Sequence, residues 1–112
     1  MMGYISIAKD FSETPFGRFP SDGPNSAERF RQELLVPEFK KSGSEEVIVD
    51  FSGVALGIGS SFLEEAFGGL IRVEGFKQDE ILCRLKIQTK LPIYKNQILK
   101  FLSEAVPGKV SG

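Results

Sequence analysis

Residues 46–72, EVIVDFSGVALGIGSSFLEEAFGGLIR, constrain the fold of this chain more than any other segment. Residues 47–51 are a short apolar run rich in β-branched side chains, which is typical of a strand covered on both faces. Gly53, Gly57 and Gly59 follow, and they predict a turn whose backbone takes conformations that bulkier residues resist. The remaining residues have a helical period. The segment therefore predicts a strand, a glycine-rich turn and an amphipathic helix.

The predicted helix has two unlike faces. At about 100° per residue, its apolar residues cover one half of the helix and should build the core; these are Phe62, Leu63, Ala66, Phe67, Leu70 and Ile71. The other half, which we expect to face water or a partner, carries Ser61, Glu64, Glu65, Gly68 and Arg72. Gly68 and Gly69 lower helix propensity by up to ~1 kcal/mol each, so close packing would be a reason for keeping them.

Further strands and helices are expected on both sides of this segment. Residues 4–8 and 81–89 alternate as strands do, and residues 16–19 (FGRF) suit a short strand. Asn25 is placed to cap a helix that contains Ala27, Phe30 and Leu34, and Pro92 opens a last helix. This order predicts an α/β fold: a mixed, mostly parallel sheet of about four strands with three helices packed on it.

Length and composition bound the class of protein. The 112 residues suit one domain, which we place at 1–106, with a loose tail at 107–112. The 14 basic and 15 acidic residues give a net charge of −1, which does not suit non-specific nucleic-acid binding. Cys83 is the single cysteine, and neither a membrane span nor a signal peptide is visible. We therefore expect a cytoplasmic protein with a Phe-rich core.

The residue types present limit the chemistry. The chain has no His, which removes Ser-His and Cys-His nucleophile pairs and the commonest metal ligand. Asp50 with Glu64 or Glu65 could form paired carboxylates, but Asp50 lies in a predicted strand and the glutamates look solvated. We therefore expect no enzyme activity, no metal and no cofactor.

The turn before the helix is open to three interpretations. Gly57 and Gly59 precede a helix N-terminus, where N–H groups attract anions, but neither a dinucleotide fingerprint nor a P-loop is complete. Ser61 with Glu64 has the capping-box spacing, which would make Ser61 a helix cap. Ser61 could also be a regulatory hydroxyl, since a phosphate there would add roughly −1.5 to −2 charges. Ser61 could be both a helix cap and a regulatory hydroxyl.

Two stretches carry a resemblance to a known family. A strand ending in DFSGV, a Ser-Ser turn and an apolar helix resemble the STAS domains of anti-sigma-factor antagonists. The closer match is to a bacterial STAS-like family of unknown function, through residues 17–37 (GRFPSDGPNSAERFRQELLVP) and 57–72 (GIGSSFLEEAFGGLIR). The resemblance implies a STAS-like domain and a signalling role without catalysis. It also implies a protein partner, a histidine-kinase-like ATPase or an anti-sigma-type regulator.

The resemblance also indicates a site. Ser61 matches the serine that the partner kinase phosphorylates in the antagonists, and Ser60 matches the serine before it. Gly59 stands where the antagonists have Asp, and Phe62 stands where they have Gly.

The candidate partner or anion-binding residues are Arg18, Asp22, Gly57, Gly59, Glu64, Glu65 and Gly68. Arg18 and Asp22 are either turn residues or part of a surface beside the serines, where Arg would suit a phosphoryl group. Two alternatives stay open: a small domain that binds a nucleotide or another anion at the Gly57–Ser61 turn, and self-association as a homodimer.

Overall fold

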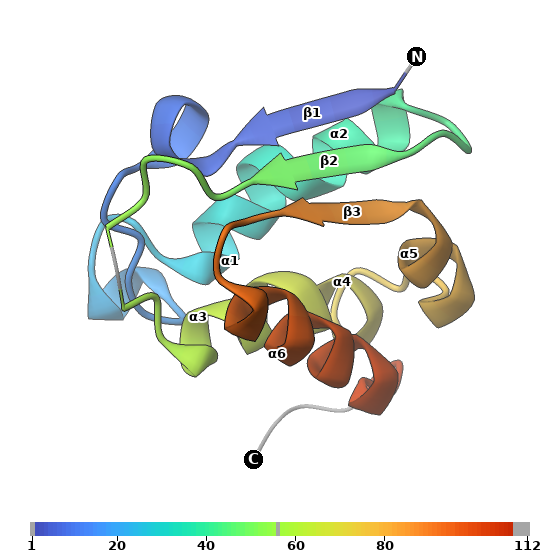
Figure 1. The fold of residues 1–112 in the computed structure, drawn as a ribbon. Helices are drawn as coiled ribbons and strands as arrows, with labels where there is room; N and C mark the ends of the chain where they lie inside the picture. Colours follow the sequence, from blue (N-terminus) through green and yellow to red (C-terminus); the bar gives the residue numbers. More distant parts are fainter. Residues whose placement is uncertain (1, 56, 109–112) are drawn as a thin grey trace.

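A three-stranded parallel sheet is the centre of the computed structural model, which describes residues 2–55 and 57–108 (Figure 1). The central strand β2, Val47–Asp50, pairs with β1, Gly3–Ser6, on one side and with β3, Leu85–Gln88, on the other. Both pairings are parallel, and the register sets Ile5 beside Val49 and Val49 beside Ile87. The expected α/β fold is confirmed, but within the described residues the sheet has three strands instead of about four, is parallel throughout instead of mixed and mostly parallel, and is accompanied by more helices than the three expected.

One long helical crossover joins β1 to β2. After β1 the chain makes a π-helical turn, Ile7–Phe11, and a short 3-10 turn, Pro20–Asp22. The crossover helix then runs without a break through α1, Ala27–Phe30, the π-helical segment Arg31–Leu35 and α2, Val36–Lys41. Its cap is Ser26, whose hydroxyl accepts a hydrogen bond from the Arg29 N–H, so the expectation that Asn25 caps the helix is wrong by one residue.

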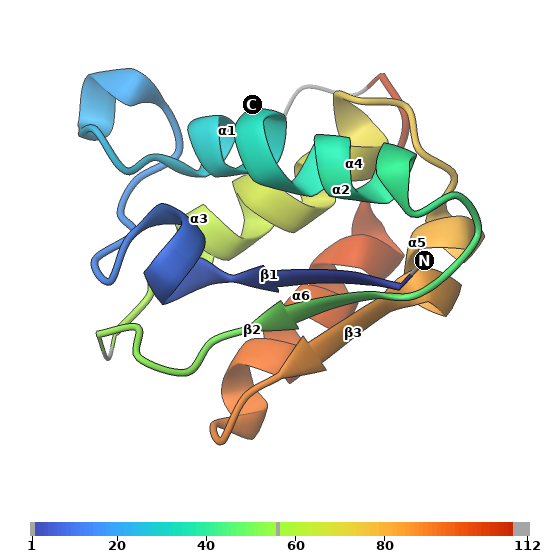
Figure 2. The same ribbon diagram turned by 90° about the horizontal axis from the view of Figure 1, so that it is seen from above.

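The second crossover holds the predicted central helix. It consists of α3, Ser60–Leu63, the π-helical segment Glu64–Gly68 and α4, Gly69–Arg72, and it is followed by α5, Gln78–Arg84. The last helix, α6, Pro92–Glu104, follows β3. Figure 2 shows that α1 to α4 lie on one side of the strands. None of the helices in the described part of the chain is long and apolar enough to cross a membrane.

The core lies between this sheet face and the helices. The predicted apolar half of the central helix is confirmed, because all six of its side chains are 1% exposed or less. Phe30 lies among them, with its ring centroid 5.9 Å from that of Phe62 and 6.4 Å from that of Phe67, which confirms a Phe-rich core. The opposite sheet face exposes Tyr4, Lys86 and Gln88, so the expectation that β2 is covered on both faces is wrong.

Two of the predicted strands are wrong. Residues 16–19 form no strand, and residues 81–84 belong to α5, so only the second half of the alternating run is extended. The physical reason is the burial of Arg84, whose guanidinium donates to the carbonyls of Phe39 at 2.7 Å and Glu45 at 2.9 Å. The helical turn buries Arg84 and leaves Cys83 exposed. In a strand, Cys83 would share the buried face with Ile81 and Leu85, and Arg84 would be exposed.

The expected tail falls mainly outside the described residues. Pro107 and Gly108 are exposed, and the Gly108 N–H donates to the Arg72 carbonyl at 3.0 Å, which ties the end of the described chain to the central helix. Residues 109–112 are not described.

Candidate functional site

The central helix begins with two exposed serines. Gly59 is the N-cap residue, and its carbonyl accepts the N–H groups of Phe62 at 3.1 Å and Leu63 at 3.3 Å. Ser60 and Ser61 therefore lie in the first helical turn, and neither hydroxyl makes a hydrogen bond within the described part of the chain. The expectation that Ser61 caps the helix is wrong, because the chain enters the helix two residues earlier.

The glycine turn is held from α6. The Tyr94 hydroxyl accepts hydrogen bonds from the N–H groups of Gly57, at 3.2 Å, and Ile58, at 3.3 Å. The Tyr94 ring stacks on Phe51 at 5.3 Å between centroids, which joins the end of β2 to the same tyrosine. Gly57 has a φ of +91°, a conformation that favours glycine. The Tyr94 hydroxyl already accepts hydrogen bonds from two N–H groups of the turn, so fewer N–H groups remain to bind a phosphate.

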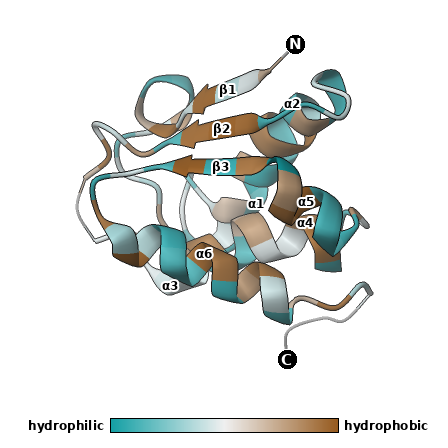
Figure 3. Ribbon diagram, turned by 45° about the vertical axis from the view of Figure 1, so that its right-hand side comes forward, coloured by the Kyte–Doolittle hydropathy of each residue, from teal (hydrophilic) through white to brown (hydrophobic). Residues whose placement is uncertain are grey.

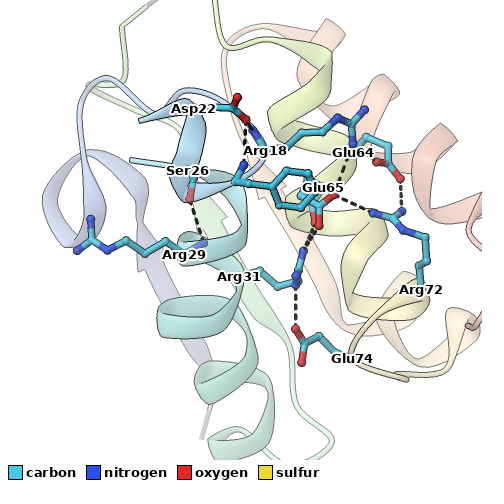
Figure 4. A network of polar contacts seen from close by, with 10 residues as sticks. Arg18, Asp22, Ser26, Arg29, Arg31, Glu64, Glu65, Arg72 and Glu74 are labelled. Atoms are coloured by element: carbon cyan, nitrogen blue, oxygen red, sulfur yellow. Dashed lines mark hydrogen bonds and ion pairs between the residues drawn. The ribbon is translucent and has the colours of Figure 1, made fainter. Parts of the chain in front are cut away.

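Three arginines and three glutamates form a connected group behind the serines, which we call the arginine–glutamate network (Figure 4). Its members are Arg18, Arg31, Arg72, Glu64, Glu65 and Glu74. Figure 4 shows that they come from the loop before α1, the first crossover helix, the central helix and the turn after it. The network therefore joins segments that lie far apart in the sequence.

Glu65 is at the centre of this network. It is 3% exposed, and its carboxylate receives Arg31 Nη1 at 2.8 Å and Arg72 Nη2 at 3.1 Å. Arg31 is 2% exposed and also donates to the Glu65 carbonyl at 2.5 Å and to Glu74 at 2.9 Å. The expectation that this half of the helix faces water or a partner is wrong for Glu65 and Gly68, which are buried, while Glu64 is partly exposed and is bonded to Arg72 and Arg18. The physical reason is that matched arginines offset the cost of burying carboxylates.

The network explains the glycine pair of the central helix. A Cβ built on Gly69 would lie 2.9 Å from Arg31 Cζ, and one built on Gly68 would lie 2.9 Å from Glu64 Oε2. Both distances are shorter than ordinary van der Waals contacts. The close packing expected at these two positions is therefore confirmed, and its cause is the guanidinium and carboxylate groups that lie across the helix.

Arg18 connects the loop before α1 to the start of the central helix. The N–H groups of Arg18 and Phe19 donate to Asp22 Oδ2 at 3.0 and 3.1 Å, which closes the loop on itself. The Arg18 side chain reaches Glu64 Oε1 at 2.5 Å, one helical turn beyond the serines. The structure thus brings Arg18 to the helix that carries Ser60 and Ser61, while the described contacts of Asp22 stay within its own loop.

The same loop exposes two aromatic side chains. Phe16 is 68% exposed and Phe19 is 43% exposed, and they flank Arg18 in the sequence. Aromatic residues and Arg are enriched among the residues that contribute most to protein–protein binding. We group the exposed residues of this loop and of the helix start under one name, the Ser60–Arg18 surface, made of Phe16, Arg18, Phe19, Ser60 and Ser61; the described link between its two parts is the Arg18–Glu64 ion pair.

Asp50 ends β2 on the exposed sheet face. Burial alone would raise the pKa of Asp50, but hydrogen bonds from the Tyr4 hydroxyl and the Ser52 N–H hold that pKa below its ordinary value. The same hydrogen bond raises the pKa of Tyr4. Asp50 thus bonds to the sheet and to its own turn, and Glu64 and Glu65 belong to the network. In the part of the chain that the structure describes, no cluster of His, Cys, Asp or Glu could hold a metal ion.

Sequence reasoning missed four residues of this region: Arg31, Arg72, Glu74 and Tyr94. Arg31 lies four residues after the buried Ala27 and therefore on the same helical face. That spacing was the available signal. Arg72 has its partners, Glu64 and Glu65, about two turns earlier in the same helix. The hydroxyl contacts of Tyr94 come from a distant segment, which no local pattern reports.

The fold and this turn define a class: a small α/β domain with a one-sided parallel sheet and two exposed serines where β2 leads into the central helix. The model of the STAS-like domain of unknown function (DUF4325) matches residues 26–89, more than half of the chain. The chain belongs to this family. Neither the curated proteins nor the solved structures gave a significant match.

Proposed function

We propose that this STAS-like domain is a regulatory module without catalytic activity, which binds a protein partner and is switched by phosphorylation of Ser61 or Ser60. The observation that carries the proposal is the pair of exposed hydroxyls in the first turn of the central helix, neither of which makes a hydrogen bond to the described residues. A helix N-terminus favours negative charge, while Glu64 one turn later opposes it. A phosphate would therefore change the local charge strongly in a place that a partner can contact.

The Ser60–Arg18 surface supports a protein partner. It combines two exposed phenylalanines and one arginine that is 32% exposed with the two serines, and the network fixes the backbone beneath it. We propose a histidine-kinase-like ATPase as the partner, by the resemblance of the turn to the anti-sigma-factor antagonists. Arg18 would then contact either the partner or the phosphate, because its ion pair with Glu64 is partly exposed and so is readily exchanged.

Affinity capture from the protein's own cells tests this proposal. Wild-type protein, Ser61→Asp and the control Ser44→Asp are compared, since Ser44 is also exposed but lies in the turn between α2 and β2. We expect Ser61→Asp to change the recovery of an ATPase partner at least about tenfold, and Ser44→Asp to leave it unchanged. Equal recovery with all three proteins would contradict the proposal.

A second candidate is ligand binding, and one feature favours it. A hollow of about 350 Å³ lies between residues 51–54, which follow β2, and residues 89–94, which follow β3. Phe51, Val54, Leu91 and Tyr94 give its lining an apolar part, and Thr89 and Lys90 give it a polar part. We rank this function second, because Tyr94 occupies the donors of Gly57 and Ile58. A thermal-shift screen with nucleotides tests it, since ligand at 100 times its Kd would add about 2.7 kcal/mol.

A further inference from the structure

The free edge of β3 lies over an apolar groove. The groove has a volume of about 260 Å³ and runs between β3, α5 and α6; its lining residues are Leu82, Leu85, Lys86, Ile87, Lys95, Leu99 and Leu102. Figure 3 shows β3 above α6, with α5 beside the start of β3. Leu82 is 36% exposed and Leu99 is 40% exposed, so part of the apolar lining is open to solvent.

The backbone of β3 is available for pairing on this side. β3 is an outer strand of the sheet, and the Gln88 carbonyl accepts the Phe51 N–H at 2.9 Å, so Gln88 turns its backbone groups toward β2. Alternate residues of a parallel strand face opposite neighbours, so Ile87 turns its N–H and C=O toward the groove. An edge of this kind is a template for an added strand.

The charges beside the groove determine which kind of strand can pair with the edge of β3. Lys86 lies on the outward sheet face beside the edge, and Lys95 lies at the groove on α6. Lys86 has a distant partner in Glu46, at 3.7 Å between two half-exposed side chains, and Lys95 makes no ion pair within the described residues. A second copy of β3 would bring further lysines to the same edge, and like charges close to one another weaken a strand pair. An acidic strand would instead be attracted.

We propose that the β3–α6 groove binds an extended acidic peptide segment of a partner protein by strand addition to β3. Apolar side chains of the segment enter the groove against Leu82 and Leu99, and the alternate acidic side chains lie on the outward face beside Lys86. About four residues facing β3 span ~13 Å. The groove shares no residue with the Ser60–Arg18 surface, so this inference goes beyond the proposed function and does not depend on it.

A fluorescein-labelled peptide of alternating Glu and Ile tests the proposal by fluorescence polarisation. We expect saturable binding, and at least about tenfold weaker binding to Lys86→Glu, because Lys86 lies beside the acidic side chains of the peptide. Lys100→Glu is the matched control, because Lys100 is exposed on α6 and does not line the groove; its affinity should stay within about twofold. A peptide with Lys in place of Glu should not bind.

Amide hydrogen exchange distinguishes strand addition from other binding. The Ile87 amide should exchange more slowly when the Glu-Ile peptide is bound. Three results would overturn the proposal: no binding at millimolar peptide, equal binding of the acidic and basic peptides, or an Ile87 amide that does not respond. Light scattering at the same protein concentration should give a monomer. A dimer whose contact protects the Ile87 amide would also overturn the proposal, because a second copy would then occupy the groove.

Discussion

Arg31 Nη1 donates to Glu65 Oε2 at 2.8 Å, and neither side chain is more than 3% exposed. This buried contact joins the first crossover helix to the central one, and the same arginine also holds Glu74 after α4. A buried ion pair adds little to stability over an apolar pair of the same shape, but the loss of one partner is costly. The contact therefore specifies how the two helices are placed, and thereby where the serines lie.

Removal of Arg31 should destabilise the domain strongly. Arg31→Met leaves Glu65 and Glu74 with fewer positive partners, and we expect a loss of about 3–5 kcal/mol in the free energy of unfolding. Arg29→Met is the control, because Arg29 is 44% exposed in its pair with Glu33, and it should cost about 1 kcal/mol or less. Urea denaturation measures both variants. Equal losses would show that the buried network has no special part in stability.

Gly69→Ala should destabilise the domain, although alanine is the better helix former by about 1 kcal/mol. Its Cβ would press on the buried Arg31 guanidinium, which cannot move without breaking its bonds to Glu65 and Glu74. We expect a net loss of about 1–3 kcal/mol in unfolding free energy.

Gly59→Ala is the control for this prediction, since the nearest atom to its Cβ would be 4.0 Å away. Because Gly59 is the N-cap, where alanine is less favourable than glycine, this substitution should cost about 1 kcal/mol or less. A more stable Gly69→Ala protein would mean that Arg31 is not fixed against the helix.

Tyr94→Phe should loosen the glycine turn while the ring stack on Phe51 stays in place. The substitution leaves the N–H groups of Gly57 and Ile58 without their acceptor, and we expect a cost of about 1–3 kcal/mol. Hydrogen exchange of these two amides should become faster in the variant than in the wild type. The exchange of the Val49 amide in the core should change less. Unchanged exchange at Gly57 and Ile58 would contradict the role given to the hydroxyl.

Tyr4→Phe should make the domain more sensitive to acid. The pKa of Asp50 is lowered in the folded state, so its contribution to stability is present above the unfolded pKa of about 3.9 and is lost as the pH falls through the folded pKa. Without the Tyr4 hydrogen bond, burial still raises this pKa, so the loss should begin at a higher pH. An NMR titration of the Asp50 carboxyl measures the shift. An unchanged midpoint would contradict the coupling.

The local pattern of the central segment was sufficient to predict β2, the glycine turn, the buried half of the helix and the close packing at Gly68 and Gly69. A resemblance that covers residues 17–37 and 57–72 agreed with the family model. These features depend on neighbouring residues, because periodicity and glycine content decide them. The position of Ser61 was harder to predict, since either Gly59 or Ser61 can serve as an N-cap.

The errors arose where distant groups determine the structure. Glu65 looks solvated in the sequence because its buried partner Arg31 belongs to the other crossover helix. Residues 81–84 alternate as a strand does, but the carbonyls of Phe39 and Glu45 bind Arg84 and favour the helical turn. Buried charges need specific partners, and a single sequence does not show which partners will meet.

The central claim is that Ser61 or Ser60 is a phosphorylated switch, and phosphosite mass spectrometry on the protein recovered from its own cells tests it most directly. The account predicts phosphate on the peptide that contains Ser60 and Ser61, and none on the peptide that contains Ser44. The phosphate should be lost in the Ser60→Ala, Ser61→Ala double variant. An unmodified Ser60–Ser61 peptide under all growth conditions, from a protein that still binds its partner, would contradict the claim.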